Sequence, residues 1–209
     1  MKHLGPALRL KIFMTILLGL VYPLTMTGLA QGLFHASANG QLISRGGQIV
    51  GAELIGQKFE RPEYFWSRPS AVDYNPLSSG GSNLGQTSAD LKKAFDERLA
   101  KLKASHPDQT VEPPQDLLFA SGSGLDPQIS LEAALYQRSR IAKARKMSEG
   151  DVQAKIDSHA EPRALGILGE PTVNVLALNL DLDQAQGITA APAAAAVPAP
   201  LPAPAATAK

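Results

Sequence analysis

The chain has 209 residues, of which 19% are charged and 5% aromatic, and its formal net charge is +1. This near-neutral balance gives no general attraction for nucleic acid. The sequence contains no Cys, which excludes disulfides and thiolate metal sites, and its four His are scattered without the spacing of metal ligands. A chain of this length can hold one ordinary domain with appendages.

The N-terminus predicts a membrane span. Residues 1–11 carry Lys2, Arg9 and Lys11 and no acidic residue, whereas residues 12–34 carry no charge. As a helix, these 23 uncharged residues would be about 34 Å long, which is enough to cross a hydrocarbon core of ~30 Å. We expect Pro23 to be tolerated there, because neighbouring groups in a spanning helix can satisfy the carbonyl that proline leaves free.

A cleaved signal peptide is the alternative interpretation, since Ala36-Ser37-Ala38 resembles a cleavage site. The uncharged run is longer than the apolar core of a signal peptide, which usually has about 7–15 residues, and this favours an uncleaved anchor. Under either interpretation, the positive charges before the span predict a cytoplasmic N-terminus. The rest of the chain would then lie outside the inner membrane, in the periplasm of a Gram-negative cell.

Beyond the span, we expect a linker over 35–47, a periplasmic globular domain over 48–183 and a tail over 184–209. The tail consists largely of Ala and Pro, and its one charge is Lys209. Such a segment has nothing large to bury, so it is predicted to be disordered.

The period of the apolar residues predicts helices over 88–104, 130–146 and 148–159, with Ser88 or Thr87, Ser130 and Ser148 as N-caps. The basic residues of the second helix are interpreted as a solvated face. Strands are predicted at 48–57, at 116–121 and over Leu176–Leu182, where leucines alternate. Together these elements predict an α+β fold, in which helices pack on a small sheet.

Polar residues gather in loops at 78–83, 119–130 and 166–175. A Gly/Ser loop that leads into a helix can bind an anion, and the stretches 78–88 and 121–130 have this layout. Neither is followed by the Gly-Lys-Ser/Thr of a phosphate loop, so turns and N-caps are the simpler interpretation. No His or Lys lies near Ser121, Ser123 or Asp126 to activate a serine, and no catalytic residue is predicted.

Several segments together resemble one known family. The segments GAELIGQKF, PEYFWSRPSAVDYNPLSSGGSNLGQT, ASGSGLDPQIS, AALYQRSRIAKAR and LGEPTVNVLALNLDL are similar to the C subunit of the Kdp potassium-transporting P-type ATPase, KdpC. The similarity runs from the anchor to about Asp183 and leaves the Ala/Pro tail out. Thr172 stands where the family usually has Arg.

The resemblance implies a non-catalytic, single-span accessory subunit of a high-affinity potassium uptake complex. Its implied partners are a channel-like potassium-binding subunit, a P-type ATPase subunit that hydrolyses ATP, and membrane lipid. The chain itself would bind no cofactor or metal tightly, because the complex handles ATP and potassium. The implied partner-contact candidates are Tyr64, Phe65, Trp66, Arg68, Ser121, Ser123 and Asp126.

The resemblance implies either of two roles for such a subunit. One is a catalytic chaperone that raises the ATP affinity of the pump subunit, with a stretch similar to the LSGGQ signature of ABC transporters. The nucleotide-binding candidates would then be Ser78, Ser79, Gly80, Gly81, Ser82 and Asn83. The other role is the assembly and stabilisation of the complex. Because ATP is cytosolic, a periplasmic domain could not contact it directly.

A function from another class is also open. The chain could be a membrane-anchored periplasmic domain that binds a small anion or polar ligand at 78–88 and 121–130.

Overall fold

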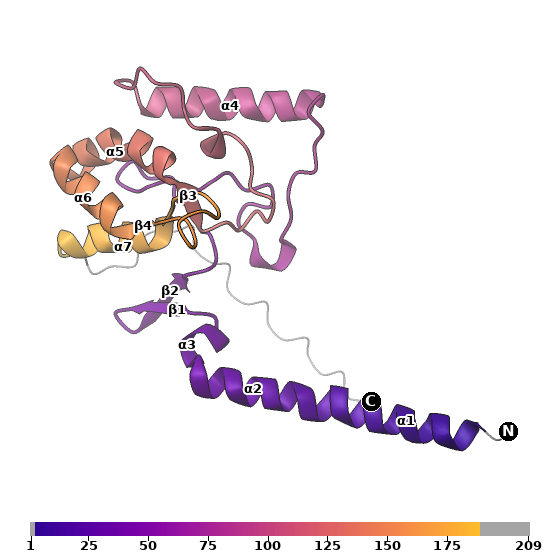
Figure 1. The fold of residues 1–209 in the computed structure, drawn as a ribbon. Helices are drawn as coiled ribbons and strands as arrows, with labels where there is room; N and C mark the ends of the chain where they lie inside the picture. Colours follow the sequence, from indigo (N-terminus) through magenta and orange to yellow (C-terminus); the bar gives the residue numbers. More distant parts are fainter. Residues whose placement is uncertain (1–2, 189–209) are drawn as a thin grey trace, which may run out of the picture. The chain divides into compact units, whose positions relative to one another are not determined.

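The computed structural model describes residues 3–188, and the chain divides into two compact units between Leu42 and Ile43. In the N-terminal unit, α1 (Leu4–Ile16), a π-helical turn (Leu17–Val21) and α2 (Tyr22–Leu33) follow one another without a break (Figure 1). This helix of 30 residues has a mean hydropathy of 1.8 in its most apolar window and is long enough to cross a membrane. It begins at Leu4, before the predicted start at Ile12, and ends at Leu33.

The π-helical turn ends at Val21, two residues before Pro23. Proline has no N–H, so the carbonyl of Gly19, one turn earlier, loses its usual α-helical partner. A wider turn at this point accommodates the proline ring without ending the helix. The short helix α3 (His35–Ala38) follows, and Asn39 donates hydrogen bonds to the His35 carbonyl at 2.7 Å and to Gln31 Oε1 at 3.0 Å.

The segment predicted to be a linker, 35–47, therefore contains regular structure. It holds α3 and the strand β1 (Leu42–Arg45), which forms a hairpin with β2 (Gln48–Ala52). Gly46 and Gly47 both have positive φ, at 58° and 79°, which suits a two-residue hairpin turn. The strand predicted at 48–57 is correct for its first half, and the chain turns after Ala52.

The described part of the second unit is here called the C-terminal domain (residues 43–188), and after the hairpin it combines helices with a small sheet. The helices are α4 (Ala89–Ser105), α5 (Leu131–Arg145), α6 (Glu149–His159) and α7 (Val175–Ala185). The sheet has the order β3-β5-β4, formed by Gln128–Ser130, Thr172–Asn174 and Ala160–Glu161. Short 3-10 turns occur at Pro76–Ser78 and Gln115–Leu117. This arrangement confirms the predicted α+β class.

The three helices predicted from apolar periodicity are confirmed, and so are their N-caps. The hydroxyls of Ser130 and Ser148 each accept a hydrogen bond from the backbone three residues on, both at 3.0 Å. Ser88 does the same for α4 at 3.4 Å. Each hydroxyl satisfies one of the N–H groups that the first turn of a helix leaves free.

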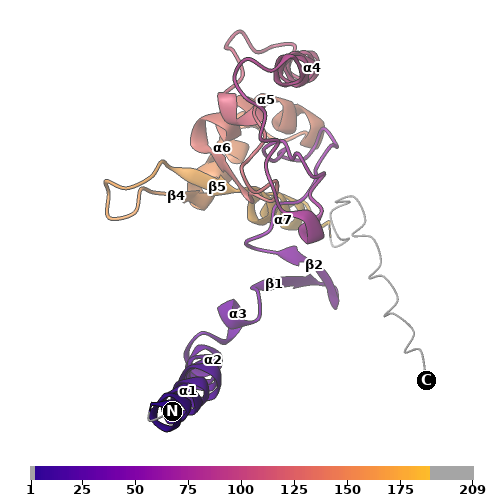
Figure 2. The ribbon, with the colours of Figure 1, turned by 90° about the vertical axis from the view of Figure 1, so that its right-hand side faces the viewer.

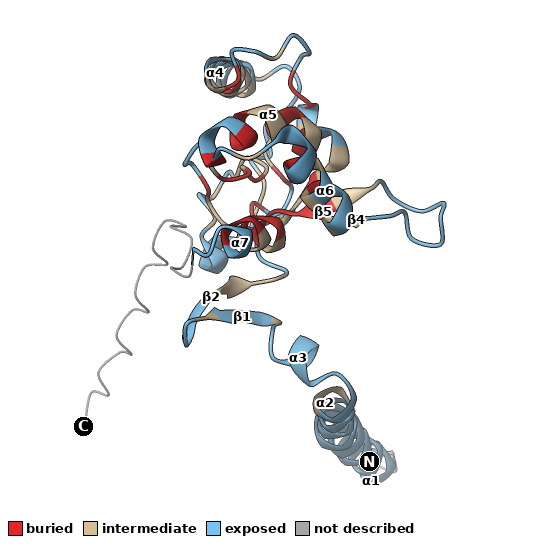
Figure 3. Ribbon diagram, turned by 90° about the vertical axis from the view of Figure 1, so that its left-hand side faces the viewer, coloured by how far each residue is buried: buried red, intermediate tan, exposed pale blue. Residues whose placement is uncertain are grey.

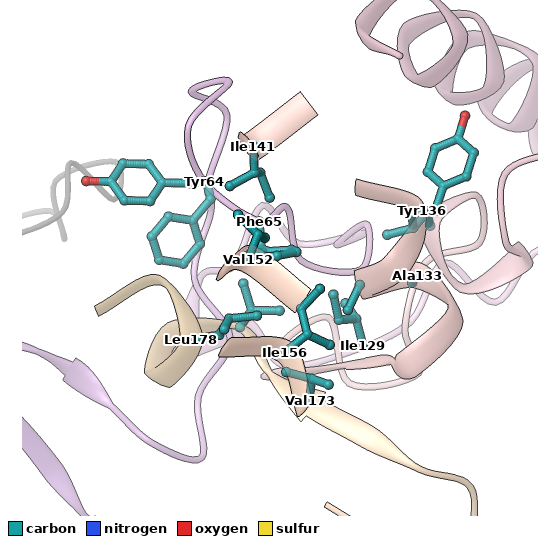
Figure 4. Close-up of a cluster of buried hydrophobic side chains, with 14 of the residues drawn as sticks. Tyr64, Phe65, Ile129, Ala133, Tyr136, Ile141, Val152, Ile156, Val173 and Leu178 are labelled. Carbon is teal, nitrogen blue, oxygen red and sulfur yellow. The ribbon is translucent and has the colours of Figure 1, made fainter. Parts of the chain in front are cut away.

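The core forms where the sheet meets the helices (Figure 4). The two outer strands, β3 and β4, are antiparallel to the central strand β5. Val173 therefore lies opposite Ile129 on one side and Ala160 on the other. Figure 3 shows the buried residues on the inward faces of α5, α6 and α7. The fully buried side chains that fill this core include Phe65, Ile129, Ile141, Val152, Ile156, Val173, Leu178 and Leu182.

The strand predicted over Leu176–Leu182 is wrong, because this segment is the helix α7. Its fully or largely buried positions include Val175, Leu178, Asn179, Leu182 and Asp183, which follow the spacing of one helical face. Two of these inward positions are polar, so apolar residues do not mark the whole inward face. The leucines of the segment repeat every second residue, which is the period of a strand. Asn174 caps the helix by accepting a hydrogen bond from Ala177 N at 3.0 Å.

Two further predictions are corrected. The strand predicted at 116–121 is a 3-10 turn, Gln115–Leu117, followed by irregular chain; Leu117 in the turn and Leu118 after it are both buried. The basic face of α5 is solvated only in part: Arg140 and Arg145 are buried at 8% and 6% exposure, whereas Arg138 and Lys143 form outward ion pairs with Glu149 and Asp108.

Candidate functional site

The aromatic segment around Tyr64, Phe65 and Trp66 is held in the domain by two buried side-chain amides. Asn179 on α7 accepts a hydrogen bond from Phe65 N at 2.8 Å and donates one to Phe65 O at 3.0 Å. Gln137 on α5 does the same for Trp66, at 2.8 and 3.2 Å. The amides replace the neighbouring strand that an extended segment would otherwise require for its backbone groups.

This arrangement buries part of the predicted partner-contact set. Tyr64 and Phe65 are 3% and 0% exposed and belong to the core, while Trp66 is half-buried at its edge. Two cations lie over the Trp66 ring, with the Arg140 guanidinium 4.4 Å and the Lys101 ammonium 5.2 Å from its centre. Trp66 is therefore the residue of this segment that lies nearest to the surface, with the exposed Lys101 beside it.

The guanidinium group of Arg140 donates hydrogen bonds to three acceptors. Its Nε donates to His106 Nε2 at 3.0 Å and its Nη2 to Gln137 Oε1 at 2.8 Å, and it also donates to the Pro62 carbonyl. Burial lowers the pKa of Arg140 to about 10. The pKa of His106 is lowered as well, by burial and by the neighbouring Arg140 charge, in spite of its hydrogen bond to the Leu102 carbonyl. A neutral His106 suits this contact, because its Nε2 must accept the proton that Arg140 offers.

The two Gly/Ser loops, separated in the sequence, lie against each other. Gly80 N and Ser79 Oγ both donate to the carbonyl of Ser123, at 2.8 and 3.0 Å. A side chain at Gly81 would meet the carbonyl of Gly122 at 3.1 Å. The structure thus joins the nucleotide-binding candidates at 78–83 to the partner-contact candidates at 121–126 in one surface, here called the paired loops (residues 78–83 and 121–126).

Hydrogen bonds within the domain use many polar groups of the paired loops. Ser121 N donates to the Pro69 carbonyl at 3.0 Å, and Ser123 Oγ accepts from Leu125 N at 3.1 Å. Asp126 pairs with Arg68 at 2.8 Å and also accepts from Gln128 N at 3.0 Å. These contacts give Ser121, Ser123, Arg68 and Asp126 structural roles, which favours the interpretation of the loops as turns over that of an anion cradle.

Gly124 is the residue that allows the loops to approach. Its φ is +67°, and a Cβ there would lie 2.6 Å from Val72 Cγ2 and 2.8 Å from the Gly80 carbonyl. Neighbouring Gly122 has open space around the corresponding position. The two glycines, two residues apart, therefore form a matched pair for mutation.

We expect Gly124→Ala to lower the free energy of unfolding by about 1–3 kcal/mol, because it forces an alanine into a strained conformation and against two neighbours. Gly122→Ala should change it by less than about 0.5 kcal/mol, as at an unconstrained surface site. Urea unfolding of the full chain in detergent, followed by the fluorescence of the single Trp, measures both. Equal effects of the two substitutions would show that the contact between the loops is unimportant.

A pocket of about 210 Å³ opens beside Trp66. Its charged residues are largely paired: Lys58 with Asp73 at 2.8 Å, and Lys101 with Glu60 at 3.4 Å. Arg98 donates to the Leu118 carbonyl at 2.9 Å, and burial lowers its pKa. The lining residues are Lys58, Phe59, Glu60, Trp66, Ser67, Pro69, Ser70, Asp73, Tyr74, Arg98, Lys101, Leu102 and Leu117.

Sequence reasoning missed this pocket. Its lysines and Arg98 come from the loop after β2 and from α4, and no local motif connects them. The one visible signal was the cluster of aromatic residues, because Tyr74 closes part of the wall. Burial raises the pKa of the Tyr74 phenol, which donates to the Arg68 carbonyl at 2.5 Å. Among residues 3–188, no group of His, Asp and Glu is placed to hold a metal ion.

Comparison with known proteins decides the family. The family model described as "KdpC: K+-transporting ATPase, c chain" matches residues 4–184. The chain belongs to the KdpC family. Proteins named "Potassium-transporting ATPase KdpC subunit" from Methylibium petroleiphilum and Herminiimonas arsenicoxydans are 51% and 50% identical to it, each over 84% of this chain and 94% of the relative. A third, from Serratia proteamaculans, is 48% identical over 86% of this chain and 96% of its own length.

The match to the KdpC family covers both structural units. It includes the apolar helix from Leu4, the paired loops and α7 almost to its end. A single helix of the described chain is long and apolar enough for a membrane span, which agrees with a KdpC subunit of single-pass type. The resemblance inferred from the sequence motifs is therefore confirmed.

Proposed function

We propose that this chain is a non-catalytic accessory subunit of an ATP-driven potassium uptake complex. The observation that carries the proposal is the KdpC family match over 4–184, together with relatives at about half identity that are named as subunits of a potassium-transporting ATPase. In this proposal its partners are a channel-like potassium-binding subunit and a P-type ATPase subunit, and hydrolysis of ATP takes place in the latter.

The contacts of the candidate residues agree with a passive role. The Ser121 side chain is buried, and Ser123 and Asp126 serve the packing of the loops. The apolar helix Leu4–Leu33 supplies a surface for lipid and for partner helices. We assign the chain to assembly and stabilisation of the complex, with the exposed parts of the paired loops and the surroundings of Trp66 as candidate contacts.

The charge pattern gives the proposed orientation. The apolar helix has Lys2 before it and Arg9 and Lys11 in its N-terminal part. The first charge beyond it is Arg45. This bias of positive charge toward the cytoplasm supports a periplasmic C-terminal domain. An effect on the ATP affinity of the pump subunit would have to be transmitted through the complex, because residues 78–83 would lie on the opposite side of the membrane from ATP.

One experiment tests assembly and orientation together. The chain has no native Cys, so single cysteines can be placed at Ala154, an exposed position on α6, and at His3. Cells with a permeabilised outer membrane are treated with a membrane-impermeant biotin maleimide, and the tagged chain is purified in mild detergent. We expect biotin on the Ala154→Cys chain, none on the His3→Cys chain, and both partner subunits in the purified material by mass spectrometry.

Biotin labelling tests the orientation, and co-purification tests the assembly, so each can be contradicted without the other. Labelling of His3→Cys without labelling of Ala154→Cys would reverse the orientation and make direct contact of the paired loops with ATP possible. Purification of the chain without either partner subunit, from cells that also express both of them, would contradict the accessory role.

A further inference from the structure

The loop between β4 and β5 carries apolar side chains that the fold does not use. It is here called the finger (residues 162–171), and it extends away from the body of the C-terminal domain (Figures 2 and 3). Leu165, Ile167 and Leu168 are 89%, 75% and 58% exposed. The sequence had suggested a polar loop at 166–175, yet its most exposed part is aliphatic.

Backbone hydrogen bonds and an ion pair connect the two sides of the finger. Ala164 and Leu168 exchange backbone hydrogen bonds at 2.8 and 2.9 Å, and Ile167 N donates to the Ala164 carbonyl at 3.2 Å. Arg163 and Glu170 close its base with an ion pair at 2.6 Å. The strands that carry it are anchored in the core, since Val173 of β5 is fully buried. The apolar tip is therefore presented on a defined support.

The backbone conformation at the tip of the finger is unfavourable for the residue found there. Leu165 and Gly166 both have positive φ, at 54° and 76°, which is the left-handed region that favours Gly, Asn and Asp. Leucine is poorly suited to this conformation, and here it is also almost fully exposed. Among residues 3–188, Leu165 is the one aliphatic residue with positive φ. A costly residue at an exposed position is a reason to look for a partner.

The charges around the tip favour a protein partner over lipid. Loops that bind the membrane surface combine apolar residues with Lys or Arg and with interfacial Trp or Tyr. The finger has neither aromatic residues nor a free cation, because Arg163 is neutralised by Glu170. A neutral apolar tip on a hydrogen-bonded hairpin suits an apolar groove of a protein, where a few buried side chains supply most of the binding energy.

We propose that the finger docks, through Leu165, Ile167 and Leu168, into an apolar groove on an integral-membrane subunit of the potassium-transporting complex. This inference rests on the proposed function, which supplies the partner. It adds an anchoring surface that is separate from the paired loops.

The test uses the full chain, tagged and co-expressed with its partner subunits. The variant Leu165→Asn/Ile167→Ser/Leu168→Ser removes the apolar tip, and Asn is well tolerated at positive φ. We expect the amount of co-purified partner to fall about tenfold or more, as for the loss of a binding hot spot. The matched control replaces Leu54 and Val111, which are 61% and 65% exposed elsewhere in the domain, by Ser and should keep wild-type co-purification.

A stability measurement separates docking from folding. The urea midpoint of the finger variant, measured on the chain alone in detergent, should equal or exceed that of the wild type, because the strained leucine is gone. A lower midpoint together with weaker co-purification would assign the finger to folding and overturn the proposal. Full co-purification of the finger variant, with normal wild-type behaviour, would also overturn it while leaving the accessory role intact.

Photocrosslinking identifies the occupant. A benzophenone amino acid at Ile167 should crosslink to an integral-membrane subunit, whereas the same group at Val111 should not. Adducts at Ile167 with lipid or with a second copy of the chain would contradict the assignment. If the wild-type chain captures no partner subunit at all, the accessory role fails, and this inference fails with it.

Discussion

Replacing Asp183 by Ala is expected to lower the free energy of unfolding of the C-terminal domain by about 3–5 kcal/mol. Asp183 Oδ1 accepts from Arg145 Nη2 at 2.8 Å, and both side chains are almost completely buried, at 0% and 1% exposure. Its other oxygen accepts from the Tyr64 hydroxyl at 3.1 Å and from Arg45 at 3.4 Å. The substitution leaves the Arg145 charge in the core without its partner, which is the costly part.

Asp181, on the same helix, provides the control. It pairs with Lys155 at 2.9 Å, but these side chains are 27% and 33% exposed. Solvent screens such a pair, so Asp181→Ala should cost no more than about 1 kcal/mol. Urea unfolding of the full chain in detergent, followed by Trp fluorescence, measures the two variants under the same conditions. Similar losses for both would mean that burial does not determine the importance of the Asp183 contacts.

The second large effect is expected at Asn179. Leucine has a similar size, but Asn179→Leu leaves the N–H and the C=O of Phe65 buried without hydrogen bonds. Each unpaired group costs roughly 1–3 kcal/mol, so the loss should be larger than that of an ordinary surface substitution. The fluorescence of the single Trp, which follows Phe65 directly, should also shift, because the segment that carries it is released.

Gln184→Leu on the same helix is the matched control, since Gln184 is exposed. We expect a change within about 0.5 kcal/mol for this variant. If Asn179→Leu were as stable as Gln184→Leu, the amide of Asn179 would not be what holds the aromatic segment in place.

Local signals in the sequence were sufficient for the helices α4, α5 and α6. The cap residues Ser88, Ser130 and Ser148 and the apolar stripes after them are contained within one segment each, so no knowledge of packing was needed. The helix α7 was not predicted from its apolar pattern, because Asn179 and Asp183 occupy its inward face. A polar residue is buried there only because distant groups, such as Phe65 and Arg145, supply its hydrogen-bond partners.

The candidate site was predicted in pieces. The motifs at 78–83 and 121–126 were visible, but their contact through the Ser123 carbonyl depends on the complete fold. The burial of Arg140 and Arg145 was missed for a related reason: their acceptors, which include the Pro62 and Glu63 carbonyls, lie far away in the sequence. Composition alone does not show which arginines of a basic helix turn inward.

The connection between Arg45 and Asp183 also concerns biosynthesis. One residue lies at the start of the C-terminal domain and the other in α7, so the native network cannot close before the ribosome has added Asp183. The same helix further contributes Leu178 and Leu182 to the core. Until α7 has been synthesised, the nascent polypeptide lacks a complete interior, so the domain cannot complete its folding earlier.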